Sequence, residues 1–149
     1  MVDTIINKQN TSEVSLQEIQ NFAVKSNNEV RVIDKIEVGQ FARQGDLYCT
    51  RIDDQFSMEG LTLSSNYQLA PGNTRGSRHV CDNLSCKIYS PSKEEIVKTN
   101  VGFKAMGPVV VAPTSWRLSH PEHADFYLPE GTYQITYQVN PIQMRRVLD

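Results

Sequence analysis

The clearest pattern in the chain is a strict alternation of polar and apolar residues close to its C-terminal end. From residue 132 to residue 139, Thr and Gln occupy every even position, and Tyr, Ile and Val occupy every odd one. Successive side chains of a β-strand point to opposite faces, so this segment predicts a half-buried strand with one aromatic-rich face. Just before it, Phe126–Leu128 leads into Pro129-Glu130-Gly131, the residue order of a tight turn. We therefore expect a hairpin over residues 124–139.

Shorter segments with β-type patterns recur along most of the chain. We expect strands near residues 29–38, 47–52, 61–63, 67–69, 87–89, 96–98, 109–111 and 115–118. All seven prolines lie after residue 70. Prolines at this density are typical of turns between short strands. About nine short strands at this spacing predict a mainly β fold, either a small β-barrel, of which a cupin-like barrel is one form, or a sandwich.

The first 40 residues have a different character. Residues 1–12 are polar and predict an arm, and residues 15–25 predict one short helix, which Ser15 and Glu18 begin as a capping box. The helix carries one apolar stripe, made of Leu16, Ile19, Phe22 and Ala23. This stripe either covers an open end of the barrel or docks onto another subunit. We divide the chain into an N-terminal arm and helix, residues 1–40, and a β-barrel domain, residues 41–149.

Composition narrows the functional classes. The chain has 149 residues, 39% of them hydrophobic and 21% charged, with a formal net charge of −2. Nucleic-acid-binding modules usually carry a basic excess, so we expect no nucleic-acid partner. The sequence has neither an apolar run long enough for a membrane helix nor the start of a signal peptide, so we expect no membrane partner and a cytoplasmic or virion location. The three cysteines are interpreted as reduced thiols.

The candidate chemistry lies in three histidines, His79, His120 and His123. Two loops at one rim of a barrel could bring them together, and three neutral imidazoles suit a divalent transition metal. Glu122 or Asp125 would then serve as a fourth ligand or orient a ring. The alternative is that the histidines make ordinary loop hydrogen bonds. No nucleophile–base motif or phosphate-binding loop occurs, so no catalytic residue is assigned and an enzyme is not favoured.

Five segments occur in a consistent order in the last two-thirds of the chain. They are Arg43-Gln-Gly-Asp46, Ala70-Pro-Gly-Asn-Thr-Arg-Gly-Ser-Arg-His79, His120-Pro-Glu-His123, Leu128-Pro-Glu-Gly-Thr-Tyr133 and Arg145-Arg-Val-Leu-Asp149. As a set they resemble an uncharacterised family of small bacterial and phage proteins with the blocks Q-G-D, G-H-x-H, H-E-x-H, L-P-x-G-x-Y and R-R-V-x-D. The resemblance implies a compact β-barrel-like fold and leaves the activity open. Ser77 stands where the family has the first histidine of G-H-x-H, which weakens a metal site here.

These observations lead to one main functional hypothesis and two alternatives. The main hypothesis is a non-enzymatic component of a phage-type virion or similar assembly, either a minor or decorating head protein or an adaptor. It would dock through its N-terminal arm onto other proteins or further copies of itself, without a cofactor. The first alternative is a metal-binding, cupin-like protein that uses the three histidines. The second is a small-ligand-binding barrel that uses Trp116 and nearby tyrosines.

Overall fold

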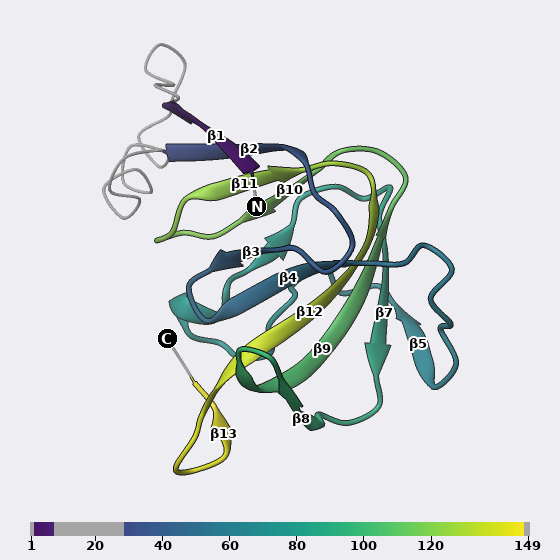
Figure 1. Ribbon diagram of the computed structural model, residues 1–149, viewed down its shortest axis with the longest axis vertical. Helices are drawn as coiled ribbons and strands as arrows, with labels where there is room; N and C mark the ends of the chain where they lie inside the picture. Colours follow the sequence, from purple (N-terminus) through teal and green to yellow (C-terminus); the bar gives the residue numbers. More distant parts are fainter. Residues whose placement is uncertain (1, 8–28, 148–149) are drawn as a thin grey trace.

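The computed structural model describes residues 2–7, by their backbone, and residues 29–147. Its strands form two sheets with the core between them, in a sandwich-like arrangement rather than a closed barrel (Figure 1). The predicted mainly β fold is confirmed, and of its two predicted forms the structure is consistent with the sandwich. No helix in the described part of the chain is long and apolar enough to cross a membrane.

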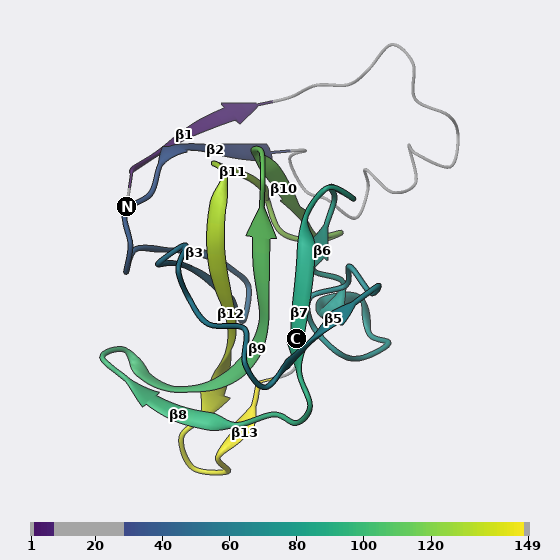
Figure 2. The same ribbon diagram turned by 90° about the vertical axis from the view of Figure 1, so that its right-hand side faces the viewer.

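The smaller sheet contains five strands. They are β1 (Val2–Asn7), β2 (Glu29–Lys35), β6 (Val80–Cys81), β10 (Trp116–Ser119) and β11 (Asp125–Leu128). Their order in space is β1-β2-β11-β10-β6, with β1 at one edge of the sheet (Figure 2). Strands β2 and β11 run parallel, whereas the other neighbours in this sheet are antiparallel. The sheet therefore joins segments from both ends of the sequence.

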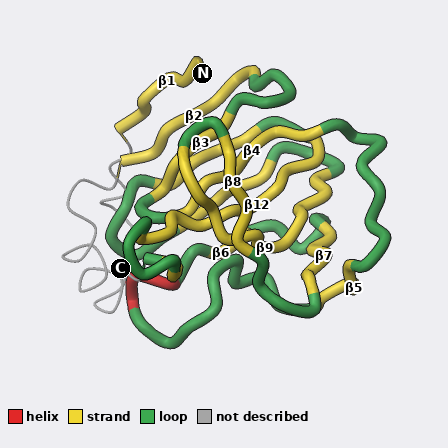
Figure 3. Tube along the Cα trace, turned by 60° about the horizontal axis from the view of Figure 1, so that its bottom comes forward, coloured by secondary structure: helices red, strands yellow, loops and turns green. Residues whose placement is uncertain are grey.

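The larger sheet contains the remaining eight strands, all paired antiparallel. They are β3 (Phe41–Gln44), β4 (Leu47–Ile52), β5 (Leu61–Ser64), β7 (Lys87–Pro91), β8 (Ile96–Thr99), β9 (Gly102–Ala112), β12 (Gly131–Asn140) and β13 (Arg145–Arg146). Six of them follow the order β3-β4-β12-β9-β7-β5, while β8 pairs with β9 and β13 pairs with β12. Loops occupy much of the chain between β5 and β7, together with one 3-10 turn at Arg75–Ser77 (Figure 3).

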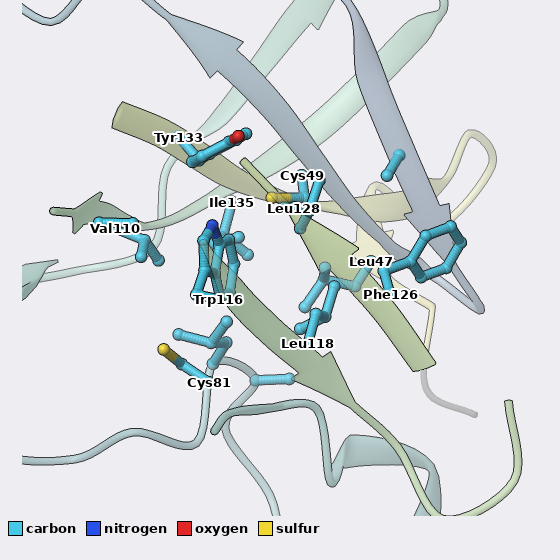
Figure 4. Close-up of a cluster of buried hydrophobic side chains, with 14 of the residues drawn as sticks. Leu47, Cys49, Cys81, Val110, Trp116, Leu118, Phe126, Leu128, Tyr133 and Ile135 are labelled. Carbon is cyan, nitrogen blue, oxygen red and sulfur yellow. The ribbon is translucent and has the colours of Figure 1, made fainter. Parts of the chain in front are cut away.

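The alternating segment near the C-terminus forms β12, as expected. Tyr133, Ile135 and Tyr137 are buried in the core, and the intervening Thr and Gln side chains point to the outer face of the larger sheet. Across the core, the Trp116 ring of β10 meets the Tyr133 ring edge-on, with their centroids 5.5 Å apart (Figure 4). The two sheets are thus held together by one apolar cluster between their facing sides.

The predicted hairpin over residues 124–139 is wrong. Strand β11 pairs with β10 and β2 in the smaller sheet, whereas β12 pairs with β4, β9 and β13 in the larger one. The turn at residues 129–130 instead carries the chain from one sheet to the other. The physical reason is that Phe126 and Leu128 bury their side chains in the core from the side opposite to Tyr133.

Part of the N-terminal prediction lies outside the described residues. This applies to the expected helix over residues 15–25 and to its proposed docking stripe, made of Leu16, Ile19, Phe22 and Ala23. Within residues 1–40, the structure describes β1 and β2. Strand β2 contributes the buried side chains of Val30 and Ile33, so this part of residues 1–40 packs into the sandwich.

Candidate functional site

The three histidines meet at one place in the fold. His79 lies directly before β6, and His120 and His123 lie in the loop between β10 and β11. The ring centroids of His79 and His120 are 4.3 Å apart, those of His120 and His123 are 4.5 Å apart, and those of His79 and His123 are 6.5 Å apart. The predicted convergence of the two loops is therefore observed, in a buried setting for His79 and His120.

Two polar residues hold His79 in place, Gln44 at the end of β3 and Asp46 in the turn to β4. Gln44 Oε1 lies 2.8 Å from Nδ1 of His79, and Asp46 Oδ1 lies 3.2 Å from its Nε2. The Gln44 amide nitrogen donates to the carbonyl oxygens of Leu118 and Ala124, so the amide oxygen is the group left to accept from the ring. Gln44 faces the core because it follows the buried Ala42 by two positions in β3.

His120 is fixed by the backbone on both sides of its ring. Its Nδ1 accepts hydrogen bonds from the backbone nitrogens of Glu122 and His123, and its Nε2 donates to the carbonyl oxygen of Gly76 at 2.9 Å. Burial, together with the nearby rings of His79 and His123, lowers the pKa of His120 to about 4. The ring is therefore neutral at pH 7, with its proton on the nitrogen that faces Gly76.

These hydrogen bonds determine what the histidine cluster, defined here as His79, His120 and His123, can do as it stands. Each ring nitrogen of His79 and His120 already has a partner within the chain. Within the described residues, no group of three or more His, Cys, Asp or Glu side chains is arranged to hold a metal ion. In this arrangement, the cluster ties the end of β3 and the turn after it to the loop before β6 and the loop after β10. Metal binding by the three histidines stays a prediction.

Sequence reasoning missed Gln44 and Asp46 as members of this site. The available signal was that both residues stand in the block Arg43-Gln-Gly-Asp46, one of the segments on which the sequence resemblance rests. Trp116, proposed as a ligand-binding side chain, is instead only 1% exposed in the core. The three cysteines are free and buried, as expected of reduced thiols.

Comparison with known families places this site inside a recognised domain. Residues 43–138 match the family model of a domain of unknown function, DUF8820. The matched region begins at β3 and includes Gln44, Asp46 and all three histidines, whereas β1 and β2 precede it. No curated protein and no solved structure matches the chain at a significant level.

Proposed function

We propose that this chain, which belongs to the DUF8820 family, is a non-enzymatic component of a protein assembly and docks through its N-terminal strand. A phage-type virion is the kind of assembly that the resemblance of its sequence blocks suggests, with the chain as a minor or decorating head protein or an adaptor. The observation that carries the proposal is the position of β1 at the edge of the smaller sheet.

An edge strand is a ready template for another chain. Strand β1 pairs with β2 on one side, and no other described strand pairs with it. Backbone N–H and C=O groups on the opposite side of such a strand can pair with a strand of a partner, which extends the sheet across the interface. Strands β1 and β2 precede the region that matches DUF8820, and β1 is the outer of the two.

The histidine cluster supports a structural role for the domain. Its ring nitrogens fix three loops relative to one another, which makes that end of the sandwich rigid. A rigid domain with an added edge strand is suited to presenting that strand to a partner, since little conformational entropy is lost on binding.

The test alters the backbone of β1 and leaves residues 43–138, the region that matches DUF8820, unchanged. A double substitution, Thr4→Pro with Ile5→Pro, removes one N–H on each side of the strand, because successive residues point their N–H groups in opposite directions. The matched control, Thr4→Ala with Ile5→Ala, keeps both N–H groups. We expect the proline variant alone to lose co-sedimentation with the native assembly and to sediment as a monomer. Normal assembly by the proline variant, or equal loss in the alanine variant, would contradict docking through the strand backbone.

The second candidate function is metal binding by a cupin-like protein, and the convergence of the three imidazole rings favours it. To act as ligands, His79 and His120 would have to exchange their present hydrogen-bond partners for the metal. Elemental analysis of the purified protein tests this directly. About one transition-metal ion per chain, lost in both His79→Ala and His120→Ala, would support this candidate over the first.

A further inference from the structure

The outer face of the larger sheet carries two cations on a common aromatic ring. Four residues on four neighbouring strands form a row across this face, and we name it the cation row: Arg43 of β3, Tyr48 of β4, Gln138 of β12 and Lys104 of β9. The register places Arg43 opposite Tyr48 and Gln138 opposite Lys104. Since all four side chains are on the face opposite to the core, they share one surface.

Both cations of the row lie close to the ring of Tyr48. The Arg43 guanidinium carbon lies 5.0 Å from the centroid of the Tyr48 ring, and Lys104 Nζ lies 4.6 Å from the same centroid. Arg43 is fixed by hydrogen bonds from Nε to the Gly45 carbonyl and from Nη2 to Gln138 Oε1, at 2.8 and 2.9 Å. Both charged groups are therefore held at one ring rather than spread into solvent.

This positive charge has no carboxylate partner in the described part of the chain. The carboxylates that form ion pairs there are those of Glu29, Glu37, Asp46, Asp54 and Asp125, and none of them pairs with either cation of the row. Among the described residues, the Lys104 ammonium group donates to the carbonyl oxygen of Val101, at 2.9 Å.

The environment of Lys104 disfavours the charged form of its side chain. The residue is only 5% exposed, and burial and the positive charge of Arg43 together lower the pKa of its ammonium group. An anion bound by both cations would offset their repulsion and compensate for the hydration that Lys104 lost on folding. Arg43 is exposed and offers access to the row from solvent.

We propose that the cation row is a binding site for a phosphate monoester group, as carried by a phosphorylated small molecule. A phosphate dianion matches the two positive charges, and its oxygens accept the remaining N–H groups of the Arg43 fork and the Lys104 ammonium group. All four residues of the row lie within the region that matches DUF8820, so the site belongs to the domain and is independent of docking through β1.

The test uses the full ¹⁵N-labelled chain and inorganic phosphate as the probe. We expect saturable shifts of the amide signals of Arg43, Tyr48, Lys104 and Gln138 at constant ionic strength. Affinity should fall about tenfold or more in Lys104→Met and in Arg43→Gln, each of which removes one charge-assisted contact. Lys98→Met, on the exposed side of the neighbouring strand β8, is the matched control and should bind as the parent does.

At about pH 8, where inorganic phosphate is mainly a dianion, succinate is a dicarboxylate of nearly equal charge, and it distinguishes phosphate recognition from attraction to any dianion. Tighter binding of phosphate than of succinate supports the proposal, and equal binding overturns its choice of phosphate. Shifts that grow linearly without saturation, or equal affinity losses in Lys98→Met and Lys104→Met, overturn the site itself. Arg43 is exposed, so Arg43→Gln keeps the test decisive should Lys104→Met fail to fold, which far-UV circular dichroism will show.

Discussion

At the residue scale, the Gln44 side chain forms hydrogen bonds with three separate groups. Its amide donates to two carbonyl oxygens and accepts from His79, so a single buried group satisfies three others. A buried polar group without its partner costs about 1–3 kcal/mol, which makes such a residue costly to replace with an apolar one. The Q-G-D block is accordingly a structural requirement of the histidine cluster, whatever else it does.

His120 should make the protein less stable in acid. Its pKa is about 4 in the folded chain, against about 6.5 for an ordinary histidine. Between pH 6.5 and 4 the unfolded chain binds a proton at this position and the folded chain does not, so the free energy of unfolding falls as the pH falls. The loss approaches about 3 kcal/mol and levels off below pH 4.

Urea denaturation of the parent and of His120→Gln, at pH 7 and at pH 5, measures this contribution. The parent should lose more stability than the variant between these two pH values. Equal losses in the two proteins would show that the unfolding free energy does not depend on the titration of His120.

Gly131 is required by the turn between the two sheets. Its φ is +147°, and a Cβ atom there would come within 2.5 Å of the Arg51 guanidinium carbon. We expect Gly131→Val to lower the free energy of unfolding by about 1–3 kcal/mol. Gly39 has a φ of +93° and open space around it, so Gly39→Val carries the backbone strain without the clash. Thermal unfolding of the two variants separates the effect of the backbone strain from that of the clash with Arg51. A Gly131→Val protein as stable as the parent would show that neither one destabilises the fold.

At the scale of elements, β12 is the strand on which the sandwich depends most. Its inner face supplies Tyr133, Ile135 and Tyr137 to the core. Ile135→Ala should lower the free energy of unfolding by about 2–5 kcal/mol, because it leaves a cavity between the sheets. Thr62→Ala, on the exposed face of β5, is the control and should stay within about 0.5 kcal/mol of the parent in the same urea titration. A near-neutral Ile135→Ala would mean that the site collapses to fill the space.

The sequence predicted the elements whose signal is local. The alternation in β12 depends on neighbouring residues alone, and both its strand and its buried face were predicted correctly. Strand β9 was expected only near residues 109–111, yet it spans Gly102–Ala112. The prediction was too short because Gly107 and Pro108 interrupt the apolar pattern, at the point where the pairing of β9 with β12 is irregular. Such a break can be read as a strand end when the partner strand is unknown.

Long-range pairing could not be predicted from the sequence. Nothing local to residues 125–128 indicates that they pair with Trp116–Ser119 and Glu29–Lys35 rather than with the strand that follows the turn. For the same reason, only part of the candidate site could be predicted. The histidines are visible as residue types, whereas the partners of His79 are determined by a turn more than thirty residues earlier.

At the scale of the whole molecule, the N-terminal segment has two parts with different importance for stability. A chain lacking residues 1–28 should remain folded, since the described strand that it loses is the outermost one of its sheet. A chain lacking residues 1–35 also loses the buried Val30 and Ile33, and it should unfold at a clearly lower urea concentration. Equal midpoints for the two truncated chains would show that β2 contributes little to the core.

The parallel pairing of β2 with β11 also affects how the protein folds during its synthesis. Val30 is synthesised well before Asp125, its partner in that ladder. Because a nascent chain grows by only about 5–20 residues each second, several seconds separate the two residues. Throughout this interval the backbone groups of β2 that face β11 in the finished sheet lack their hydrogen-bond partners. The ladder between β2 and β11 can therefore form only after residues 125–128 have left the ribosome, so this part of the smaller sheet is completed late in the synthesis of the domain.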